Sequence, residues 1–188
     1  MTKTKKMTMC ALFCALIAIG AFIQIPLPYL DYFTFQFLFV IMAGLILGSK
    51  LGMLSAALYV AIGLAGFPIF AAGGGIMYVI KPSFGYLIGF IVAAYLTGLV
   101  SEKLGEVNFK NSLIAALSGL VAVYVIGIGY KYFMLNLVTG VKTSLLVLIM
   151  SAFPLDMPGD FVFCIIASML NVRIGKIAGV NKGKLRTR

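Results

Sequence analysis

The chain has 188 residues, of which 62% are hydrophobic and 11% charged, and its formal net charge is +10. An average soluble domain is about 45–50% apolar and roughly 25% charged, so this sequence lacks the polar side chains that a water-exposed surface requires. The composition therefore predicts an all-α integral membrane protein, because long unbroken apolar runs favour helices over the alternating pattern of barrel strands.

The apolar runs predict six transmembrane helices in a single membrane domain covering residues 1–188. The first run is longer than the apolar core of a signal peptide and has no cleavage site after it, so we expect it to be retained. We expect the last helix to be interrupted near Pro154 and Pro158, because proline removes a backbone donor and clashes with the preceding turn. The approximate ranges are 6–25, 34–48, 51–66, 83–101, 112–138 and 145–172.

The charged residues predict the orientation of these helices. With an even number of spans, both ends of the chain lie on the same side, and most of the 15 basic residues fall there. Because basic residues mark the cytoplasmic side, both termini are predicted to be cytoplasmic. The basic segment 173–188 is expected to contact anionic lipid or a cytoplasmic partner and not nucleic acid. The outer side carries balanced charges, namely Lys81, Lys131, Lys142, Asp31, Asp156 and Asp160.

The first outer segment, residues 24–36, contains two prolines that make it stiff and extended. It is also rich in aromatic rings, which either form an interfacial belt or line a ligand pocket. Both interpretations stay open at this point. The rings at and beside this segment are Tyr29, Tyr32, Phe33, Phe35 and Phe37.

The second outer segment, residues 63–82, contains three successive glycines, Gly73, Gly74 and Gly75. Their backbone freedom suits a cradle against a small molecule, although a plain flexible loop explains them equally well. Pro82 is expected at the first position of the fourth span, where a missing N–H costs nothing. The start of that helix would then present free N–H groups to the outer side.

Two charged residues are expected inside the membrane near the outer side. Asp160 and Lys131 each lie about seven residues, or roughly 10 Å along a helix, from the outer ends of their spans, so their depths should match. They form either a structural ion pair or contacts to a polar ligand. Tyr86 is placed to line the same cavity, whereas Phe90 and Tyr124 are expected to be packing residues.

At these outer motifs the sequence resembles the BioY family, the biotin-specific substrate-binding (S) components of energy-coupling-factor (ECF) transporters. The match runs in order from about residue 11 to residue 165. The matching motifs are Pro26-Leu-Pro28, Thr34-Phe-Gln36, Ala43-Gly-Leu-Ile-Leu-Gly48, Leu51-Gly52 with Ser55 and Tyr59, Gly63-x-x-Gly66-x-Pro68, Gly73–Gly75, Pro82-x-x-Gly85-Tyr86-x-x-Gly89-Phe90 and Pro158-Gly-Asp160.

The resemblance implies a six-helix bundle in the bacterial cell membrane that binds biotin from outside. It also implies docking to a membrane scaffold subunit and two cytoplasmic ATPases, since the chain has no visible ATP-binding loop. Many S components carry two alanines four residues apart in the first helix for that docking, and Ala11 and Ala15 match this pattern. Small residues at this spacing allow close helix approach in lipid, although chance alanines explain them equally well.

The resemblance also suggests how biotin would be held, with no cofactor. The carboxylate of Asp160 would accept the two N–H groups of the ureido ring, and Gln36 or Tyr86 would serve its carbonyl. Aromatic side chains, with Phe33 among them, would pack on the fused rings. The candidates for binding the ligand's carboxylate are Lys81, the backbone of Gly73, Gly74 and Gly75, and the start of the fourth span.

One position departs from the family pattern. Family members commonly have a lysine three residues after the Pro-Gly-Asp motif, where this chain has Phe163. Lys131 is our candidate for the missing cation. The departure keeps other ligands open, such as thiamine, riboflavin or a biotin-like precursor. A membrane enzyme is the less favoured alternative, because the chain has no histidine and no cysteine cluster, and we expect neither catalytic residues nor a metal site.

Overall fold

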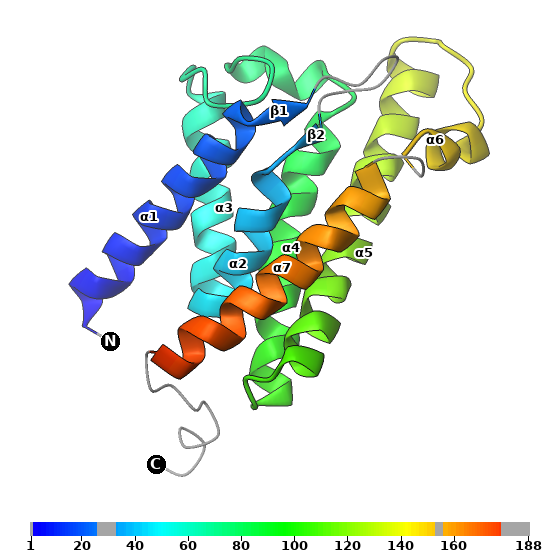
Figure 1. Ribbon diagram of the computed structural model, residues 1–188. Helices are drawn as coiled ribbons and strands as arrows, with labels where there is room; N and C mark the ends of the chain where they lie inside the picture. The colour runs from blue at the N-terminus through cyan, green and yellow to red at the C-terminus, as the bar shows by residue number, and fades with distance from the viewer. Residues whose placement is uncertain (1, 26–32, 153–155, 178–188) are drawn as a thin grey trace.

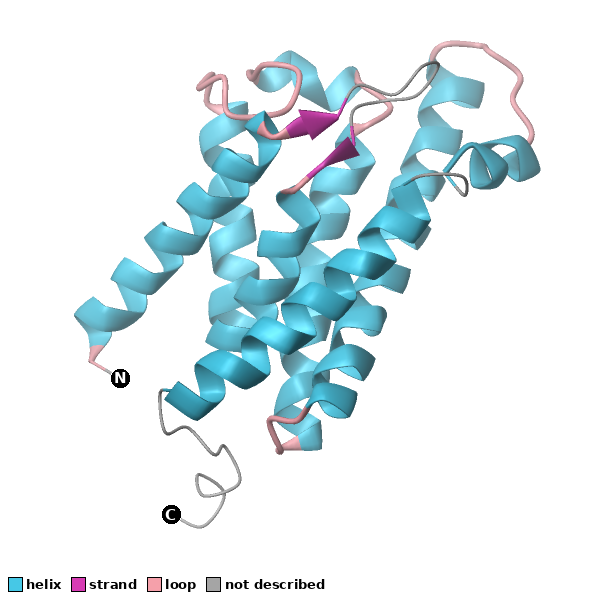
Figure 2. Ribbon diagram, viewed as in Figure 1, coloured by secondary structure: helices cyan, strands magenta, loops and turns pink. Residues whose placement is uncertain are grey.

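The computed structural model of the protein describes residues 2–25, 33–152 and 156–177, which form a bundle of helices (Figures 1 and 2). The pair of two-residue strands β1 (Gln24–Ile25) and β2 (Phe33–Thr34) lies at one end, and so does the short helix η1 (Ile76–Ile80). The longer helices are α1 Lys3–Phe22, α2 Gln36–Leu47, α3 Ser49–Leu64, α4 Phe84–Leu104, α5 Phe109–Phe133, α6 Leu145–Ala152 and α7 Asp156–Ile177, and α5 continues as the π-helical turn η2 Met134–Val138.

The helices follow the six predicted apolar ranges closely. Three are long and apolar enough to cross a membrane, namely α1, α4 and the continuous stretch Phe109–Val138. The pair α6 and α7 forms a fourth candidate, bent by 50°, as the expected interruption requires. Pro158 lies in the first turn of α7, where proline is tolerated, and Pro154 lies outside the described residues. Because α2 and α3 have only 12 and 16 residues, the count of six spans stays a prediction.

Close helix packing depends on small residues. The most extensive contact joins α4 to α5. A Cβ atom added at Gly89 would lie 3.1 Å from the Cα atom of Val123, and one at Gly85 would collide with the side chain of Tyr130. These glycines therefore allow α4 and α5 to approach closely without polar side chains between them, as is common for helices in lipid.

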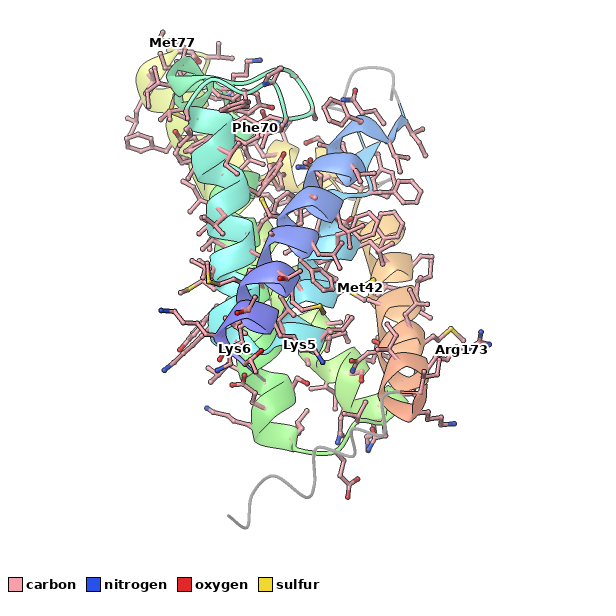
Figure 3. The ribbon with its side chains drawn as sticks, turned by 90° about the vertical axis from the view of Figure 1, so that its left-hand side faces the viewer. Lys5, Lys6, Met42, Phe70, Met77 and Arg173 are labelled. Carbon is pink, nitrogen blue, oxygen red and sulfur yellow. The ribbon has the colours of Figure 1, made fainter. Side chains whose placement is uncertain are left out.

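The two ends of the bundle differ in charge. The start of α1 and the end of α7 lie at the same end (Figure 1). Figure 3 shows Lys5, Lys6 and Arg173 there, and Met77 at the opposite end, where the strands and η1 lie. This arrangement agrees with the predicted sorting of charge, so we refer to the end with β1, β2 and η1 as the outer end.

The turn between α2 and α3 is held by a carboxylate from α4. Gly48, with a φ of 85°, is the single residue between the two helices. The backbone N–H of Ser49 donates to Oε1 of Glu102 over 2.8 Å, and the Ser49 hydroxyl donates to Oε2 over 2.9 Å. Glu102 thus satisfies free donors at the start of α3, an end that attracts negative charge.

The start of α4 differs slightly from expectation. This helix begins at Phe84, and Pro82 lies in the preceding turn, in which Phe84 N–H donates to the carbonyl of Lys81. Pro82 is therefore not the first residue of the helix. The fixed backbone angle of proline suits this turn equally well, which is why the motif alone did not distinguish the two positions.

Candidate ligand site

A cavity of about 260 Å³ lies in the outer half of the bundle. Its wall combines aromatic rings with two lysines, two aspartates and a glutamine. Residues far apart in sequence meet here, because β2, α2, the loop before η1, η1, the segment between η1 and α4, and each of the helices α4, α5, α6 and α7 contribute to the wall. The lining residues are Phe33, Thr34, Gln36, Phe37, Ala71, Ala72, Tyr78, Lys81, Ser83, Tyr86, Leu87, Phe90, Val123, Tyr124, Lys131, Ser151, Ala152, Asp156 and Asp160.

The carboxylate of Asp160 is held by a tyrosine hydroxyl. Tyr124 Oη on α5 donates to Oδ2 of Asp160 on α7 over 2.9 Å. The ring of Tyr86 on α4 stands edge-on to that of Tyr124, with centroids 6.2 Å apart and planes at 85°. One oxygen of Asp160 is therefore oriented from within the protein, and the carboxylate retains acceptor capacity for a ligand in the cavity.

Asp160 and Lys131 were expected to lie at the same depth in the membrane. Both side chains line the same cavity, but their depths differ, because Tyr124 and not Lys131 lies level with Asp160. Within the described part of the chain Asp160 accepts a hydrogen bond from Tyr124, and a contact of Asp160 or Lys131 with a polar ligand stays a prediction. Lys131 is two helical turns beyond Tyr124 on α5, about 10 Å further toward the outer end.

Lys81 approaches the cavity from the segment between η1 and α4. Its Nζ atom donates to the carbonyl of Ala72 over 3.0 Å and lies 4.6 Å from the centroid of the Tyr78 ring. Because Tyr78, Ala72 and Lys81 all line the cavity, the cation is fixed at its wall. Together with Lys131, it makes the outer part of the cavity suitable for a ligand anion.

Gln36 lies at the start of α2 in a hydrogen-bonded chain. Its Oε1 accepts from the hydroxyl of Thr34 over 3.0 Å, and its Nε2 donates to Tyr59 Oη over 2.6 Å. Tyr59 in turn donates to the carbonyl of Ile69 over 3.1 Å. The amide of Gln36 is therefore locked in one orientation, while each of its polar atoms can make a further bond.

An aromatic stack supports the Phe33 side of the cavity. The rings of Phe33 and Phe163 stack with centroids 5.3 Å apart and planes at 17°, and Phe35 packs on Phe163 at 4.8 Å. A Cβ atom at Gly159 would lie 2.5 Å from the Phe33 ring, so only glycine leaves room for this contact. Phe163, which replaces the family's usual lysine, is 5% exposed and supports the cavity wall from behind.

Several expected site residues fall elsewhere. Gly73, Gly74 and Gly75 lie beside the cavity and not among its lining residues, where Ala71 and Ala72 stand instead. The amides of Gly73 and Gly75 already donate to the carbonyls of Phe70 and Gly63, so a role for them in holding a ligand anion receives no support from the geometry. This loop curves inward at the two residues before the glycines, which composition did not indicate.

Two residues that were expected to pack are part of the wall. Tyr124 and Phe90 both line the cavity, and Tyr124 makes the hydrogen bond to Asp160. Ala11 and Ala15 lie far from the cavity in sequence and are exposed on α1. Pro26, Pro28, Tyr29 and Tyr32 lie outside the described residues, so the structure does not place them.

Fold and site together define a multi-pass membrane protein with a small polar and aromatic ligand cavity near one end. The model of the BioY family matches residues 1–179. A probable biotin transporter BioY of Lysinibacillus sphaericus is 39% identical over 174 residues, covering 93% of this chain and 88% of the relative. A biotin transporter BioY of Rhizobium etli is 32% identical over 177 residues, covering 89% and 91%.

A solved structure has the same fold. The crystal structure of the S-component for biotin from an ECF-type ABC transporter matches with a TM-score of 0.72 and 27% sequence identity, covering 94% of this chain and 95% of that chain. The chain therefore belongs to the BioY family. It is a membrane transport protein of the S-component class, and the alternative of a membrane enzyme is not supported.

Proposed function

We propose that this protein captures biotin on the outer face of the bacterial cell membrane as the S component of an ECF-type uptake transporter. The observation that carries the proposal is the Asp160 carboxylate, oriented by Tyr124 and exposed to a cavity that also contains two lysines. A ligand with N–H donors at one end and a carboxylate at the other fits this distribution of charge. The names of the relatives support biotin as that ligand.

In this proposal each end of biotin has a partner. Asp160 accepts the two ureido N–H groups, while Tyr86 or Gln36, which line the same cavity, donates to the ureido carbonyl. Phe33 supplies an aromatic surface for the fused rings. The carboxylate at the end of the aliphatic chain meets Lys131 or Lys81, because charge-assisted hydrogen bonds are the stronger kind.

Transport requires partners that this chain does not contain. We propose that the exposed Ala11 and Ala15 on α1 contact the membrane scaffold subunit, which connects the S component to cytoplasmic ATPases. Their exposure and their spacing of four residues on one helix face support this role, since small side chains allow two helices in lipid to approach closely.

The first experiment is isothermal titration of the detergent-solubilised protein with biotin, together with mass spectrometry of any co-purified ligand. The Asp160→Asn variant should bind biotin at least about tenfold more weakly, because its amide N–H faces the ureido donors and a buried unpaired donor costs about 1–3 kcal/mol. Glu106→Gln, which removes one negative charge from an exposed residue outside the cavity, serves as the control. Normal binding by Asp160→Asn would refute the site.

The ligand's identity needs a separate comparison. Phe163 stands where the family commonly has a lysine, so a biotin-like precursor stays a competing ligand beside thiamine and riboflavin. Unlabelled biotin, such a precursor, thiamine and riboflavin should be compared as competitors of labelled biotin. Equal or better competition by any compound other than biotin would overturn the assignment of biotin as the ligand.

A further inference from the structure

Gln24 connects the two chain segments that form one side of the cavity, although it is not itself a lining residue. Its backbone lies in β1, paired with Thr34 of β2. Its Nε2 atom donates to the carbonyl of Ala71 over 2.6 Å and to the carbonyl of Ala21 at the end of α1 over 2.9 Å. Thr34 and Ala71 both line the cavity, so Gln24 contacts both of the segments that form this side of it.

Ala71, whose carbonyl accepts the hydrogen bond from Gln24, lies in a tight turn. Phe70 and Gly73 exchange backbone hydrogen bonds of 2.9 and 3.2 Å, which leaves Ala71 and Ala72 at the tip of the turn. Lys81 holds the carbonyl of Ala72. Among the side chains that the structure describes, Gln24 is the one recorded as donating to the carbonyl of Ala71, so it sets the distance between this turn and α1.

A second connection runs parallel to the first. Thr34 donates to Gln36, Gln36 donates to Tyr59, and Tyr59 donates to the carbonyl of Ile69 in the segment that leads to the turn. Two hydrogen-bonded paths therefore connect β2 to the segment at Ala71, one through Gln24 and one through Gln36 and Tyr59. The path through Tyr59 is deeply buried, whereas Gln24 is half-buried and is the first residue of the first outer segment.

From these contacts we infer that Gln24 is a positioning residue that holds the turn at Ala71 and Ala72 against the bound ligand and thereby slows ligand release. The inference rests on the proposed function for the identity of the ligand. Gln24 acts through the turn and does not touch the ligand. Loss of its two hydrogen bonds would let the turn move outward, and changes of this kind in related complexes act mainly on the dissociation rate.

The test uses two variants of the full chain. Gln24→Ala removes the side chain, and Gln24→Glu keeps its shape while replacing the donor by an acceptor that faces two carbonyls. Both should release labelled biotin, in a chase with unlabelled biotin, about tenfold faster than the wild type, because each loses two hydrogen bonds. Their association rates should change little, and Gln24→Glu should release biotin at least as fast as Gln24→Ala.

A matched control is available in the same chain. Asn136 also donates from one amide nitrogen to two carbonyls, those of Tyr132 and Thr143, both over 3.0 Å, but it does not reach the turn at Ala71. Asn136→Ala should keep the wild-type release rate. If it accelerated release as much as Gln24→Ala, the effect would be general loosening of the outer end and the inference would be wrong.

A second measurement works without any ligand. Hydrogen exchange of the backbone amides in residues 66–75 should be faster in ligand-free Gln24→Ala than in the wild type, and unchanged in Asn136→Ala. Unchanged exchange in Gln24→Ala, or wild-type biotin release by both Gln24 variants, would overturn the inference. Failure of the wild type to bind biotin would instead count against the proposed function, and the exchange measurement would still test whether Gln24 holds the turn at Ala71 and Ala72.

Discussion

The carboxylate of Asp160 accepts a hydrogen bond from the hydroxyl of Tyr124, and two lysines line the same cavity. Tyr124 orients one carboxylate oxygen at 2.9 Å. Lys131 lines the cavity about two turns further out on α5. A bound ligand would therefore meet an acceptor at the deeper end and cations near the outer end, so the direction in which it enters determines which groups it meets first.

Lys131→Ala tests whether this residue takes over from the lysine that Phe163 replaces. Hydrogen bonds to charged groups contribute about 1.5–3 kcal/mol, so we expect biotin affinity to fall by about tenfold or more. Isothermal titration measures the change. Lys142→Ala, which removes an exposed lysine outside the cavity, is the matched control. If Lys131→Ala bound biotin as tightly as this control, Lys81 alone would have to hold the ligand's carboxylate.

The sequence predicted that Asp160 and Lys131 share a cavity, but not that Tyr124 is the partner of Asp160. Position along one helix follows from residue counting, because the rise per residue is constant. The depth of one helix relative to another does not, and Lys131 lies about 10 Å beyond Tyr124, the residue that contacts Asp160. The rotation of α5 against α7 does not follow from counting either, since both helices are apolar around most of their circumference and no amphipathic pattern marks the inner face. The contact of Tyr124 with Asp160 depends on that rotation, and the stack of Phe33 on Phe163 depends on how β2 lies against α7.

At the scale of the helices, prediction succeeded where apolar runs end at charged residues, glycine or proline. The predicted range 51–66 differs from α3 by two residues at each end, and the 50° bend between α6 and α7 lies where an interruption was predicted. Prediction was weaker in the outer segments. The pairing of Gln24 with Thr34 joins residues ten apart and has no turn motif that predicts it, and the inward turn at Ala71 depends on a contact to Gln24, 47 residues away in sequence.

The capping of α3 by Glu102 gives a prediction at this scale. Glu102→Ala removes both hydrogen bonds to Ser49 and leaves the start of α3 without its negative partner. Helix-capping contacts contribute about 1 kcal/mol, so the thermal midpoint of the purified protein should fall by several degrees. Biotin affinity should stay within about twofold of wild type, because such caps act locally on stability and Glu102 lies at the inner end.

Glu106→Ala is the comparison for this variant. Glu106 is an exposed acid four residues further along the chain, and its carboxylate accepts a hydrogen bond only from the side chain of Asn108 among the described residues. It should leave the thermal midpoint nearly unchanged. An equal fall in both variants would mean that the loss of negative charge at this end, and not the contact to Ser49, is responsible.

At the scale of the whole molecule, the two functions that we propose are located on different surfaces. The cavity lies among β2, α2 and α4 to α7 near the outer end, while α1 packs on α2 and α3 and leaves Ala11 and Ala15 exposed. Gln24 follows α1 directly and holds one cavity wall. Binding of a partner to α1 would therefore act on the helix whose last turn accepts a hydrogen bond from Gln24, which offers a route from docking to release.

Ala15→Trp tests whether the exposed face of α1 is a docking surface or only faces lipid. A bulky ring on a lipid-facing surface costs little, whereas it prevents the close approach of a second helix. In cells that contain the scaffold subunit and ATPases, we expect loss of most biotin uptake, with unchanged biotin affinity of the purified protein. Val125→Trp, at a position on α5 that is 68% exposed, should keep both uptake and affinity. Normal uptake by Ala15→Trp would show that α1 does not dock through this face.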